Sequence, residues 1–197
     1  ETEIGDMTME YVQPIRDRKK IEAMKHYLKG KSIRDYLLFV MGISSALRVS
    51  DICTIRLKQI WNGKSVPDFI SLREQKTGKA KLFPISKNLE KAIHEYIKYY
   101  NPSNPDEFVF KSRKGTNTPI TRIRAFQIIK DAAKAVGIKD NIGTHSMRKT
   151  FGYWAYKEGY DISLLSEAFG HSSEQVTRRY IGITQDDVSE IYINLNL

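Results

Sequence analysis

The sequence contains one cysteine, Cys53, and only four histidines among its 197 residues. A lone cysteine cannot form an internal disulfide, and its presence favours a reducing compartment. No two histidines lie four residues apart and no pair of cysteines exists, so the spacing typical of a zinc site is missing. The chain also lacks the glycine-rich loop, closed by Lys-Ser or Lys-Thr, that holds nucleotide phosphates. We therefore expect an activity that uses neither a metal nor a nucleotide cofactor.

Long hydrophobic runs are missing as well. The longest one, residues 36–43, is far shorter than the ~20 residues that cross a bilayer. Residues 1–20 are polar and mixed in charge, unlike a signal peptide. We therefore expect a cytoplasmic protein with no membrane partner. Since 32 Lys and Arg against 23 Asp and Glu leave a net charge of +9, a polyanionic partner such as nucleic acid is favoured.

The length suits one compact domain, and most of the chain has helical periodicity. Capping residues predict where the helices begin. Asp17 and Ser32 precede the first two helices, of which the second carries a broad apolar stripe and should be deeply buried. Ser50 precedes a third, short helix over residues 51–54. Later helices are expected after four further positions: Ser86, Thr121 (to about residue 136), Gly143 (residues 144–158) and Asp161 (to Phe169).

Residues 57–85 have a different pattern, with short runs of β-favouring residues separated by turn residues. Three runs predict an antiparallel sheet of three strands: Gln59–Trp61, Phe69–Arg73 and Lys81–Phe83. The tip of the second hairpin is residues 75–79. The fold class expected is α+β, predominantly helical, with one small sheet.

Some residues of this predicted fold suggest a ligand-binding or catalytic role, although each also has a plain structural explanation. His145 and Arg148 lie three apart on a predicted helix, so one phosphate fits between their side chains. A partly buried histidine beside a solvated arginine explains the pair equally well. Arg48 ends a buried helix and needs a partner there. Asp51 can be that partner in a purely structural ion pair, or it can hold the guanidinium ready for a ligand.

The C-terminal part carries a second group of such residues. Ser172 and Ser173 begin a further helix, which carries Tyr180 beside paired arginines. His171 follows Gly170 and can simply cap the preceding helix. By itself, Tyr180 is one of eleven tyrosines and is more typical of amphipathic packing than of a nucleophile. Lys76, at the hairpin tip, resembles a surface lysine that protects a sheet edge.

Taken together, four separated motifs resemble the tyrosine recombinase (phage integrase) family in order and in spacing. The resemblance extends from about residue 10 to residue 183 and includes the eight residues between His171 and Tyr180. The motifs are residues 46–51 with Arg48 and Asp51, residues 75–79 with Lys76, residues 143–151 with His145 and Arg148, and residues 169–180 with His171 and Tyr180.

The resemblance implies a mixed-α catalytic domain that cuts and rejoins DNA through a covalent 3′-phosphotyrosine, without metal or ATP. Carried over to this sequence, Tyr180 is the nucleophile, Arg48 and Arg148 hold the scissile phosphate, and His145 and His171 bind that phosphate. The remaining two assignments are Lys76, which protonates the departing 5′-oxygen, and Asp51, which supports the site. A phenol with a pKa near ~10 needs such a positive setting in order to attack.

The sequence departs from the family pattern at three positions. Asp51 stands where glutamate is also common, Lys149 follows Arg148 where histidine is frequent, and no histidine follows Tyr180 two places on. None of these changes removes a catalytic residue type. Lys79 and Lys81 lie close to Lys76, so a shift of one residue in the hairpin changes which lysine points inward.

The resemblance also implies partners and boundaries. Residues 1–14 are expected to be a linker, 15–183 the catalytic domain and 184–197 a tail, exchanged between protomers in some relatives. An N-terminal core-binding domain is expected to be missing from this chain. The partner is double-stranded DNA at specific recombination sites, bound as a homotetramer by a protein that is monomeric when free. The expected source is a phage or integrative element, acting at the bacterial nucleoid.

Candidate DNA-contact residues are basic side chains outside the catalytic set: Lys79, Lys111, Arg113, Lys114, Arg122 and Arg124. Two other functions remain open. A type IB topoisomerase-like enzyme uses similar residues but relaxes DNA without site preference, whereas a recombinase makes new junctions from paired sites. A catalytically silent DNA-binding protein on the same scaffold forms no covalent adduct with DNA.

Overall fold

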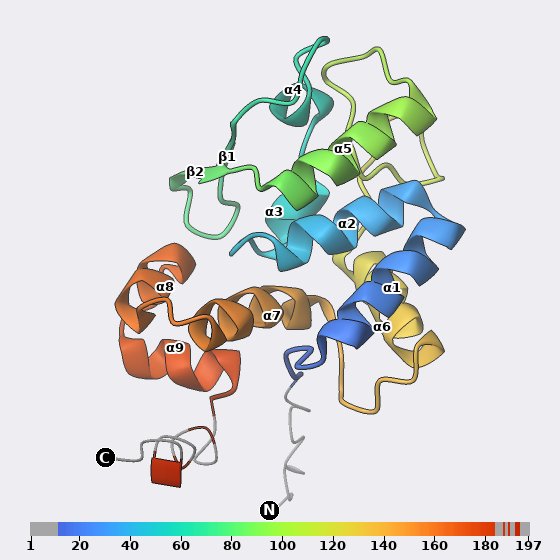
Figure 1. The fold of residues 1–197 in the computed structure, drawn as a ribbon. Coiled ribbons are helices and arrows are strands. Elements are labelled where there is room, and N and C mark those ends of the chain that lie inside the picture. The colour runs from blue at the N-terminus through green and yellow to red at the C-terminus, as the bar shows by residue number, and fades with distance from the viewer. Residues whose placement is uncertain (1–11, 184–186, 188, 190–191, 194–197) are drawn as a thin grey trace, which may run out of the picture.

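The computed structural model of the chain describes residues 12–183, 187, 189, 192 and 193 (Figure 1). These residues form a mostly helical fold with a small antiparallel sheet, as the sequence predicts. The elements, in chain order, are α1 (Arg18–Lys31), α2 (Ile33–Ile43), α3 (Val49–Cys53), α4 (Leu57–Ile60), β1 (Phe69–Arg73), β2 (Ala80–Pro84), α5 (Lys87–Tyr100), α6 (Arg122–Ala135), α7 (Thr144–Lys157), α8 (Ile162–Phe169) and α9 (Glu174–Ile181).

Side-chain caps start most of the long helices where the sequence predicts them. Ser32, Ser86 and Thr121 each accept a hydrogen bond from the backbone N–H three residues later, at the starts of α2, α5 and α6. The side chains of Asp161 and Ser173 also accept a bond from a first-turn N–H, in α8 and α9. Such caps satisfy amide groups that have no partner inside the helix. The helix boundaries are thus encoded locally in the sequence.

Helix α2 is the centre of the main core. Leu37, Leu38, Phe39 and Met41 are fully buried, which confirms the prediction of a deeply buried second helix. The helix packs against α1, α5 and α7. A Cβ atom at Gly42 would lie 2.9 Å from the Cβ atom of Met147 in α7, so only glycine permits this approach. The packing therefore fixes the N-terminal half of α7 against the core.

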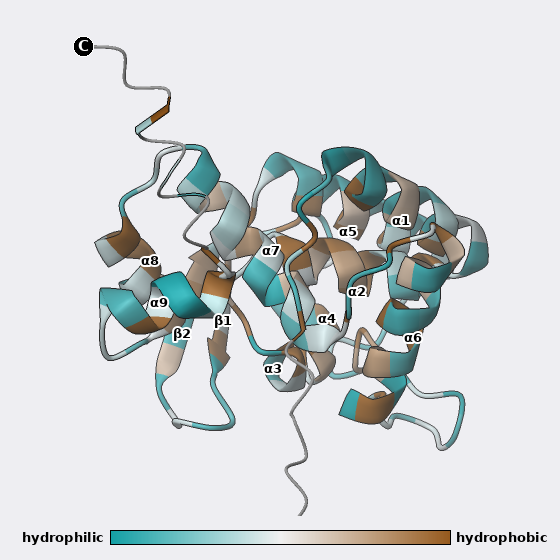
Figure 2. Ribbon diagram, turned by 90° about the horizontal axis from the view of Figure 1, so that it is seen from below, coloured by the Kyte–Doolittle hydropathy of each residue, from teal (hydrophilic) through white to brown (hydrophobic). Residues whose placement is uncertain are grey.

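A second, smaller hydrophobic cluster holds α8 and α9 against α7. Its buried members include Phe169, Leu165 and Ile181, and Tyr180 packs against it while remaining partly exposed. Figure 1 shows α8 and α9 together on one side of the molecule, with α7 connecting them to the larger helical body. Hydrophilic and hydrophobic residues alternate along α9 (Figure 2), as expected for a helix that covers a core on one side only.

The first of the three predicted strands, Gln59–Trp61, is wrong. The sheet has two strands, β1 and β2, paired from Phe69 opposite Pro84 to Arg73 opposite Ala80. Residues 59–60 instead end the short helix α4, where the side chain of Gln59 accepts a hydrogen bond from the N–H of Arg56. The amides of Leu57 and Lys58 bond to the carbonyls of Glu107 and Pro105. These long-range bonds outweigh a weak β preference over three residues.

Two other boundaries differ from expectation. Helix α3 begins at Val49, so Arg48 occupies the N-cap position and Ser50 lies inside the helix. The predicted linker lies outside the described residues except for 12–14, as does most of the predicted tail. Within the described residues, no helix is both long and apolar enough to cross a membrane.

Candidate active site

The structure brings residues from the four sequence motifs to one place. Arg48 starts α3, the β1–β2 hairpin lies beside it, α7 carries His145 and Arg148, and α8 and α9 place His171 and Tyr180 opposite. The hairpin touches the α8 end directly, because the Lys81 ammonium donates a 2.7 Å hydrogen bond to the carbonyl of Ala168. Segments more than a hundred residues apart thus form one site, and Figure 1 shows the β1–β2 hairpin next to α8.

Arg148 is the most enclosed cation of the site, with only 5% of the residue exposed. Its Nη2 donates a 2.6 Å hydrogen bond to the carbonyl of Phe169. Its guanidinium carbon lies 4.9 Å from the Phe169 ring centroid and 5.7 Å from that of Tyr180. The buried Nε has no hydrogen-bond acceptor among the described residues. Burial lowers the pKa of Arg148, but an arginine remains charged at any physiological pH.

Arg48 forms an ion pair with Glu74, whose Oε1 lies 3.1 Å from Nη1. The interpretation of Asp51 as the partner of Arg48 is therefore wrong, because the carboxylate that faces the guanidinium comes from the hairpin. Thr77, Arg48 and Lys81 together outweigh burial and lower the pKa of Glu74. A charged carboxylate thus lies beside Arg48.

Asp51 supports the hairpin. It is 2% exposed, and its Oδ1 accepts a 2.9 Å hydrogen bond from the backbone N–H of Gln75. Its buried Oδ2 has no hydrogen-bond partner among the described residues. An unpaired buried carboxylate oxygen is costly, and the nearby charges of Lys81 and Arg148 offset part of that cost. The predicted supporting position is thus occupied by a buried acid that anchors the residue before Lys76.

His145 lies in the first turn of α7 and remains accessible to solvent. Desolvation by surrounding protein atoms lowers its pKa, and the charges of Arg148, Lys149 and Arg48 lower it further. The imidazole is therefore neutral at pH 7, with one nitrogen able to accept a proton.

The rings of His171 and Tyr180 contact each other beside the second hydrophobic cluster. The His171 ring stacks on Phe169 at 5.1 Å and meets the Tyr180 ring edge to face at 4.9 Å. Nδ1 of His171 is 2.9 Å from Oγ1 of the buried Thr177, which fixes the ring orientation. The backbone N–H of His171 also bonds to Ser166, so the histidine closes α8 as well. Sequence reasoning missed Thr177, which stands one helical turn before Tyr180.

The hairpin presents two lysines in different settings. Lys76 is exposed in the turn after β1, and no bond from its side chain is seen within the described part of the chain. The ammonium of Lys81 lies 3.9 Å from Oε1 of Glu74, and burial lowers the pKa of Lys81. Lys81 is thus the hairpin lysine that contacts Glu74, the partner of Arg48.

Lys149 is a further cation that sequence reasoning noted only as a departure. The residue is 3% exposed, and its ammonium lies 5.3 Å from the centroid of the Tyr180 ring. Burial, and then the charge of Arg16, lower the pKa of Lys149 to about 8. The sequence signal that could have revealed it is a second basic residue directly after the motif arginine, Arg148.

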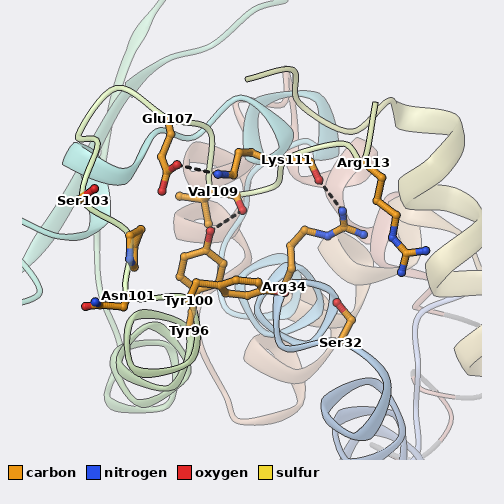
Figure 3. A pocket seen from close by; sticks show the side chains of 11 residues that line it. Ser32, Arg34, Tyr96, Tyr100, Asn101, Ser103, Glu107, Val109, Lys111 and Arg113 are labelled. Atoms are coloured by element: carbon orange, nitrogen blue, oxygen red, sulfur yellow. Dashed lines mark hydrogen bonds and ion pairs between the residues drawn. The ribbon is translucent and has the colours of Figure 1, made fainter. Parts of the chain in front are cut away.

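Among the basic residues predicted to contact a polyanion, Lys79 lies in the hairpin beside Glu74, and the charge of Arg122 lowers the pKa of His145. Figure 3 shows Lys111 turned toward Glu107, with which it pairs at 2.7 Å, and Arg34 donating to the Lys111 carbonyl. Arg34, Glu107 and Lys111 line the pocket drawn in Figure 3, and Arg113 lines it too. The exposed members of the predicted set are Arg113, Lys114, Arg122, Arg124 and Lys79. Lys111 is thus already used inside the protein, whereas the others face solvent.

The geometry describes an anion site beside a phenol. Two arginines converge on it: the buried Nε of Arg148 has no hydrogen-bond acceptor among the described residues, and Nη1 of Arg48 faces the Glu74 carboxylate. Charge-assisted hydrogen bonds from guanidinium groups match the oxygens of a phosphate or sulfate. The Glu74 carboxylate lies where such an anion would compete for Arg48.

We expect Glu74→Gln to increase the response of the protein to sulfate. Without sulfate, loss of the carboxylate leaves Arg48 with a weaker partner, and the thermal midpoint falls by about 2–4 °C for about 1 kcal/mol. Added sulfate takes the vacated position and raises the midpoint of the variant more than that of the unmodified protein. Differential scanning calorimetry in sulfate and in chloride of equal ionic strength measures this difference. The control is Glu90→Gln, an exposed carboxylate near His94; equal sulfate responses in the two variants would contradict the competition.

Known proteins share this chain's sequence pattern. The model of the phage integrase family matches residues 16–186. A probable integrase/recombinase of Bacillus subtilis, YoeC, is 43% identical over 184 residues, which cover 93% of this chain and 97% of that protein. The tyrosine recombinase XerA of Pyrococcus horikoshii is 30% identical over 171 residues, covering 86% of this chain and 57% of XerA. The chain thus spans little more than half of this second relative.

Solved structures share its fold. A crystal structure of XerA recombinase superposes with a TM-score of 0.76 at 18% identity, covering 94% of this chain and 66% of that one. XerH site-specific recombinase bound to its palindromic difH substrate gives a TM-score of 0.68 at 17% identity, covering 89% of this chain and 51% of XerH. At such low identity the likeness shows the fold alone.

Proposed function

Because this chain belongs to the phage integrase family, we propose that it is the catalytic domain of a tyrosine-type site-specific DNA recombinase. It cleaves and rejoins DNA strands through a covalent bond between Tyr180 and a phosphate of the backbone. The domain occupies residues 15–183. Relatives named as integrases and tyrosine recombinases support this proposal.

One observation carries the proposal. The buried Nε of Arg148 has no hydrogen-bond acceptor among the described residues, Arg148 lies over the Tyr180 ring, and Arg48 faces the Glu74 carboxylate. Unsatisfied buried donors are costly, so a protein keeps them where a ligand supplies the acceptors. The non-bridging oxygens of a DNA phosphate are suitable acceptors, because two guanidinium groups bind them in a fixed orientation.

The proposed reaction is a transesterification at phosphorus. The Tyr180 oxygen attacks phosphorus, the bond from phosphorus to the 5′-oxygen breaks, and the DNA 3′-end becomes linked to the tyrosine. The phenolic proton passes to a base while an acid protonates the departing 5′-oxygen. Rejoining is the same exchange in reverse, in which a 5′-hydroxyl attacks the phosphotyrosine. Since one phosphodiester replaces another, the exchange needs no external energy source.

The side chains around Tyr180 have different roles in this reaction. Arg48 and Arg148 stabilise the charge that develops on the phosphoryl oxygens. His145 is neutral at pH 7 because its pKa is lowered, so it is able to accept the tyrosine proton and to hydrogen-bond the phosphate. His171, oriented by Thr177, approaches the phosphate from the α9 side.

The experiment is covalent trapping on DNA. The protein is incubated in EDTA with a duplex nicked just downstream of the cleavage site, so that the short 5′-hydroxyl fragment diffuses away and rejoining stops. We expect an adduct that survives denaturation, with the DNA attached to the peptide containing Tyr180. Absence of any adduct from a protein that binds the duplex would favour a silent DNA-binding protein. Relaxation of plasmids without site preference would favour a topoisomerase.

The acid that protonates the 5′-oxygen is proposed to be Lys76 and not Lys81. Lys81 already donates to the Ala168 carbonyl and pairs with Glu74. The Lys76 side chain is exposed and has no such contact within the described residues, and we propose that the turn moves to bring it to the leaving oxygen.

We expect Lys76→Ala to slow cleavage by roughly 10²–10³-fold, the range typical of a lost general acid. A duplex with sulfur in place of the 5′-bridging oxygen restores the rate, since a thiolate leaves without protonation. Lys81→Ala also slows cleavage, but the sulfur substrate does not restore it, because Lys81 acts on Glu74 and the hairpin. Single-turnover rates on the two substrates measure this. If sulfur restores only the Lys81 variant, the roles are exchanged.

DNA is the proposed partner, as double-stranded recombination sites bound by four protomers, and the free protein is proposed to be monomeric. DNA-bound relatives such as XerH support the DNA partner. The exposed basic residues Arg113, Arg122 and Arg124 are proposed to contact the duplex backbone or bases.

Lys157 pairs with Asp187 at 2.9 Å, so this part of the tail lies against α7 of the same chain. Tail exchange between protomers then requires this pair to break. The proposed setting is the bacterial nucleoid, with a phage or integrative element as source.

A further inference from the structure

The chain enters the domain through residues 12–16, here named the entry strap, which cross α7 before α1 begins. Ile15 is 2% exposed, and its N–H donates a 2.9 Å hydrogen bond to Oγ1 of Thr150. Its carbonyl accepts a 3.0 Å hydrogen bond from Nε1 of Trp154. Both partners belong to α7, so these long-range bonds attach the strap to the helix that carries Arg148.

The strap continues to the end of the helix that carries the nucleophile. Nη2 of Arg16 donates a 3.0 Å hydrogen bond to the carbonyl of Gly182, the residue that caps α9. The Arg16 guanidinium is held in place from other sides too, since it bonds to Gln13 at 3.2 Å and lies 5.4 Å from the Tyr153 ring centroid. Tyr180 is two residues before this cap.

Gly182 is adapted to this contact. Its φ angle of 76° is a left-handed conformation that favours glycine. A Cβ atom there would lie 2.9 Å from Nη2 of Arg16 and 3.4 Å from the Pro14 ring. The strap thus packs directly on the backbone of the cap. A cation at a helix C-terminus also interacts favourably with the exposed carbonyls of the last turn.

Lys149 joins the strap to Tyr180 a second time. Its ammonium donates a 2.8 Å hydrogen bond to the carbonyl of Val12 and lies 5.3 Å from the centroid of the Tyr180 ring. The strap therefore touches the end of α9 through Arg16 and the nucleophile ring through Lys149. Helix α9 has only eight residues, and a helix this short depends on such tertiary contacts.

We propose that Arg16 is a positioning residue for the cleavage reaction, which holds the C-terminal end of α9 so that Tyr180 faces the phosphate. The inference rests on the proposed role of Tyr180 as the nucleophile. Arg16 does not touch the reacting atoms; it acts through the Gly182 carbonyl. Misplacing a reacting group by about 1 Å costs up to roughly 100-fold in rate, so a loosened α9 slows cleavage even when DNA binds normally.

The test compares Arg16→Ala, Arg16→Lys and Arg18→Ala on the nicked duplex at saturating protein. Arg18 is the matched control, because its guanidinium lies over Trp154 and pairs with Glu158, at the end of α7 rather than at the cap of α9. We expect Arg16→Ala to lower the single-turnover cleavage rate by roughly tenfold with an unchanged Kd for DNA. Arg16→Lys recovers most of the rate, since an ammonium can still donate to Gly182. Arg18→Ala cleaves at the rate of the unmodified protein.

Hydrogen exchange gives a readout that needs no activity. Amides of residues 178–183 should exchange several-fold faster in Arg16→Ala than in Arg18→Ala, while amides of α2 are unchanged. Normal cleavage and normal exchange in Arg16→Ala would overturn the inference and leave the proposed function intact. If the unmodified protein forms no adduct, the proposed function fails, and the exchange data still decide whether Arg16 holds α9. Uniformly faster exchange across the domain would assign Arg16 to general stability instead.

Discussion

Tyr180→Phe is expected to abolish the covalent adduct with DNA, lowering its rate of formation by at least roughly 10⁴-fold, as losses of catalytic nucleophiles do. The change removes one oxygen and keeps the ring, so the contacts of the ring with Phe169 and His171 remain. Arg48 and Arg148, which are proposed to bind the phosphate, are unaltered, and the Kd for DNA should stay within about twofold. Gel electrophoresis after denaturation measures the adduct, and fluorescence anisotropy measures the Kd.

Tyr156→Phe is the matched control, because Tyr156 also packs against the second hydrophobic cluster and lies under a cation, Arg178. It should form the adduct at the rate of the unmodified protein. An adduct that persists in Tyr180→Phe would show that another residue attacks, and peptide mapping would identify it. Loss of DNA binding together with loss of the adduct would indicate misfolding, which circular dichroism detects.

Arg148→Lys is expected to reduce cleavage by roughly 10²–10³-fold, the loss typical of one donor to a transition-state oxyanion. Lysine keeps the positive charge, but it lacks the planar group that bonds to the Phe169 carbonyl while presenting Nε to the phosphate. Ground-state binding of DNA, which depends on many surface cations, should change by less than about threefold. Single-turnover rates at saturating protein separate the two effects.

Arg179→Lys provides the comparison for Arg148→Lys. Arg179 is exposed and adjoins Tyr180 in α9, so the same substitution there tests whether lysine is tolerated near the nucleophile. Its cleavage rate should remain within about twofold of the unmodified protein. Cleavage by Arg148→Lys at a comparable rate would mean that charge alone suffices at this position, contrary to the proposed two-point binding of the phosphate.

Local sequence signals determined most of the helical framework. Caps such as Ser32, Ser86 and Thr121 start helices where predicted because a side-chain oxygen needs only its own first turn to act. Gly170 and Gly182 end α8 and α9 for an equally local reason, the left-handed φ that glycine adopts without strain. The prediction failed at residues 59–61. The amides of Leu57 and Lys58, at the start of α4, bond to the carbonyls of Glu107 and Pro105, and these bonds favour the helix over a strand.

The order and spacing of the motifs also determined which residues form the candidate site. The amino-acid sequence is sufficient to single out the two arginines, the two histidines and the tyrosine of the site: Arg48, His145, Arg148, His171 and Tyr180. They lie together because α2, α7 and the second cluster fix their helices. Their residue types follow from the chemistry of a phosphate and need no coordinates. The family is likewise carried by sequence alone.

Only the tertiary structure decided how those residues are partnered. Glu74, not Asp51, faces Arg48; Lys81, not Lys76, contacts Glu74; and Arg16 reaches the end of α9. Each contact joins segments far apart in sequence, or depends on which way a hairpin residue points. Pairing of side chains at this range is set by packing of the whole domain, and no local pattern encodes it.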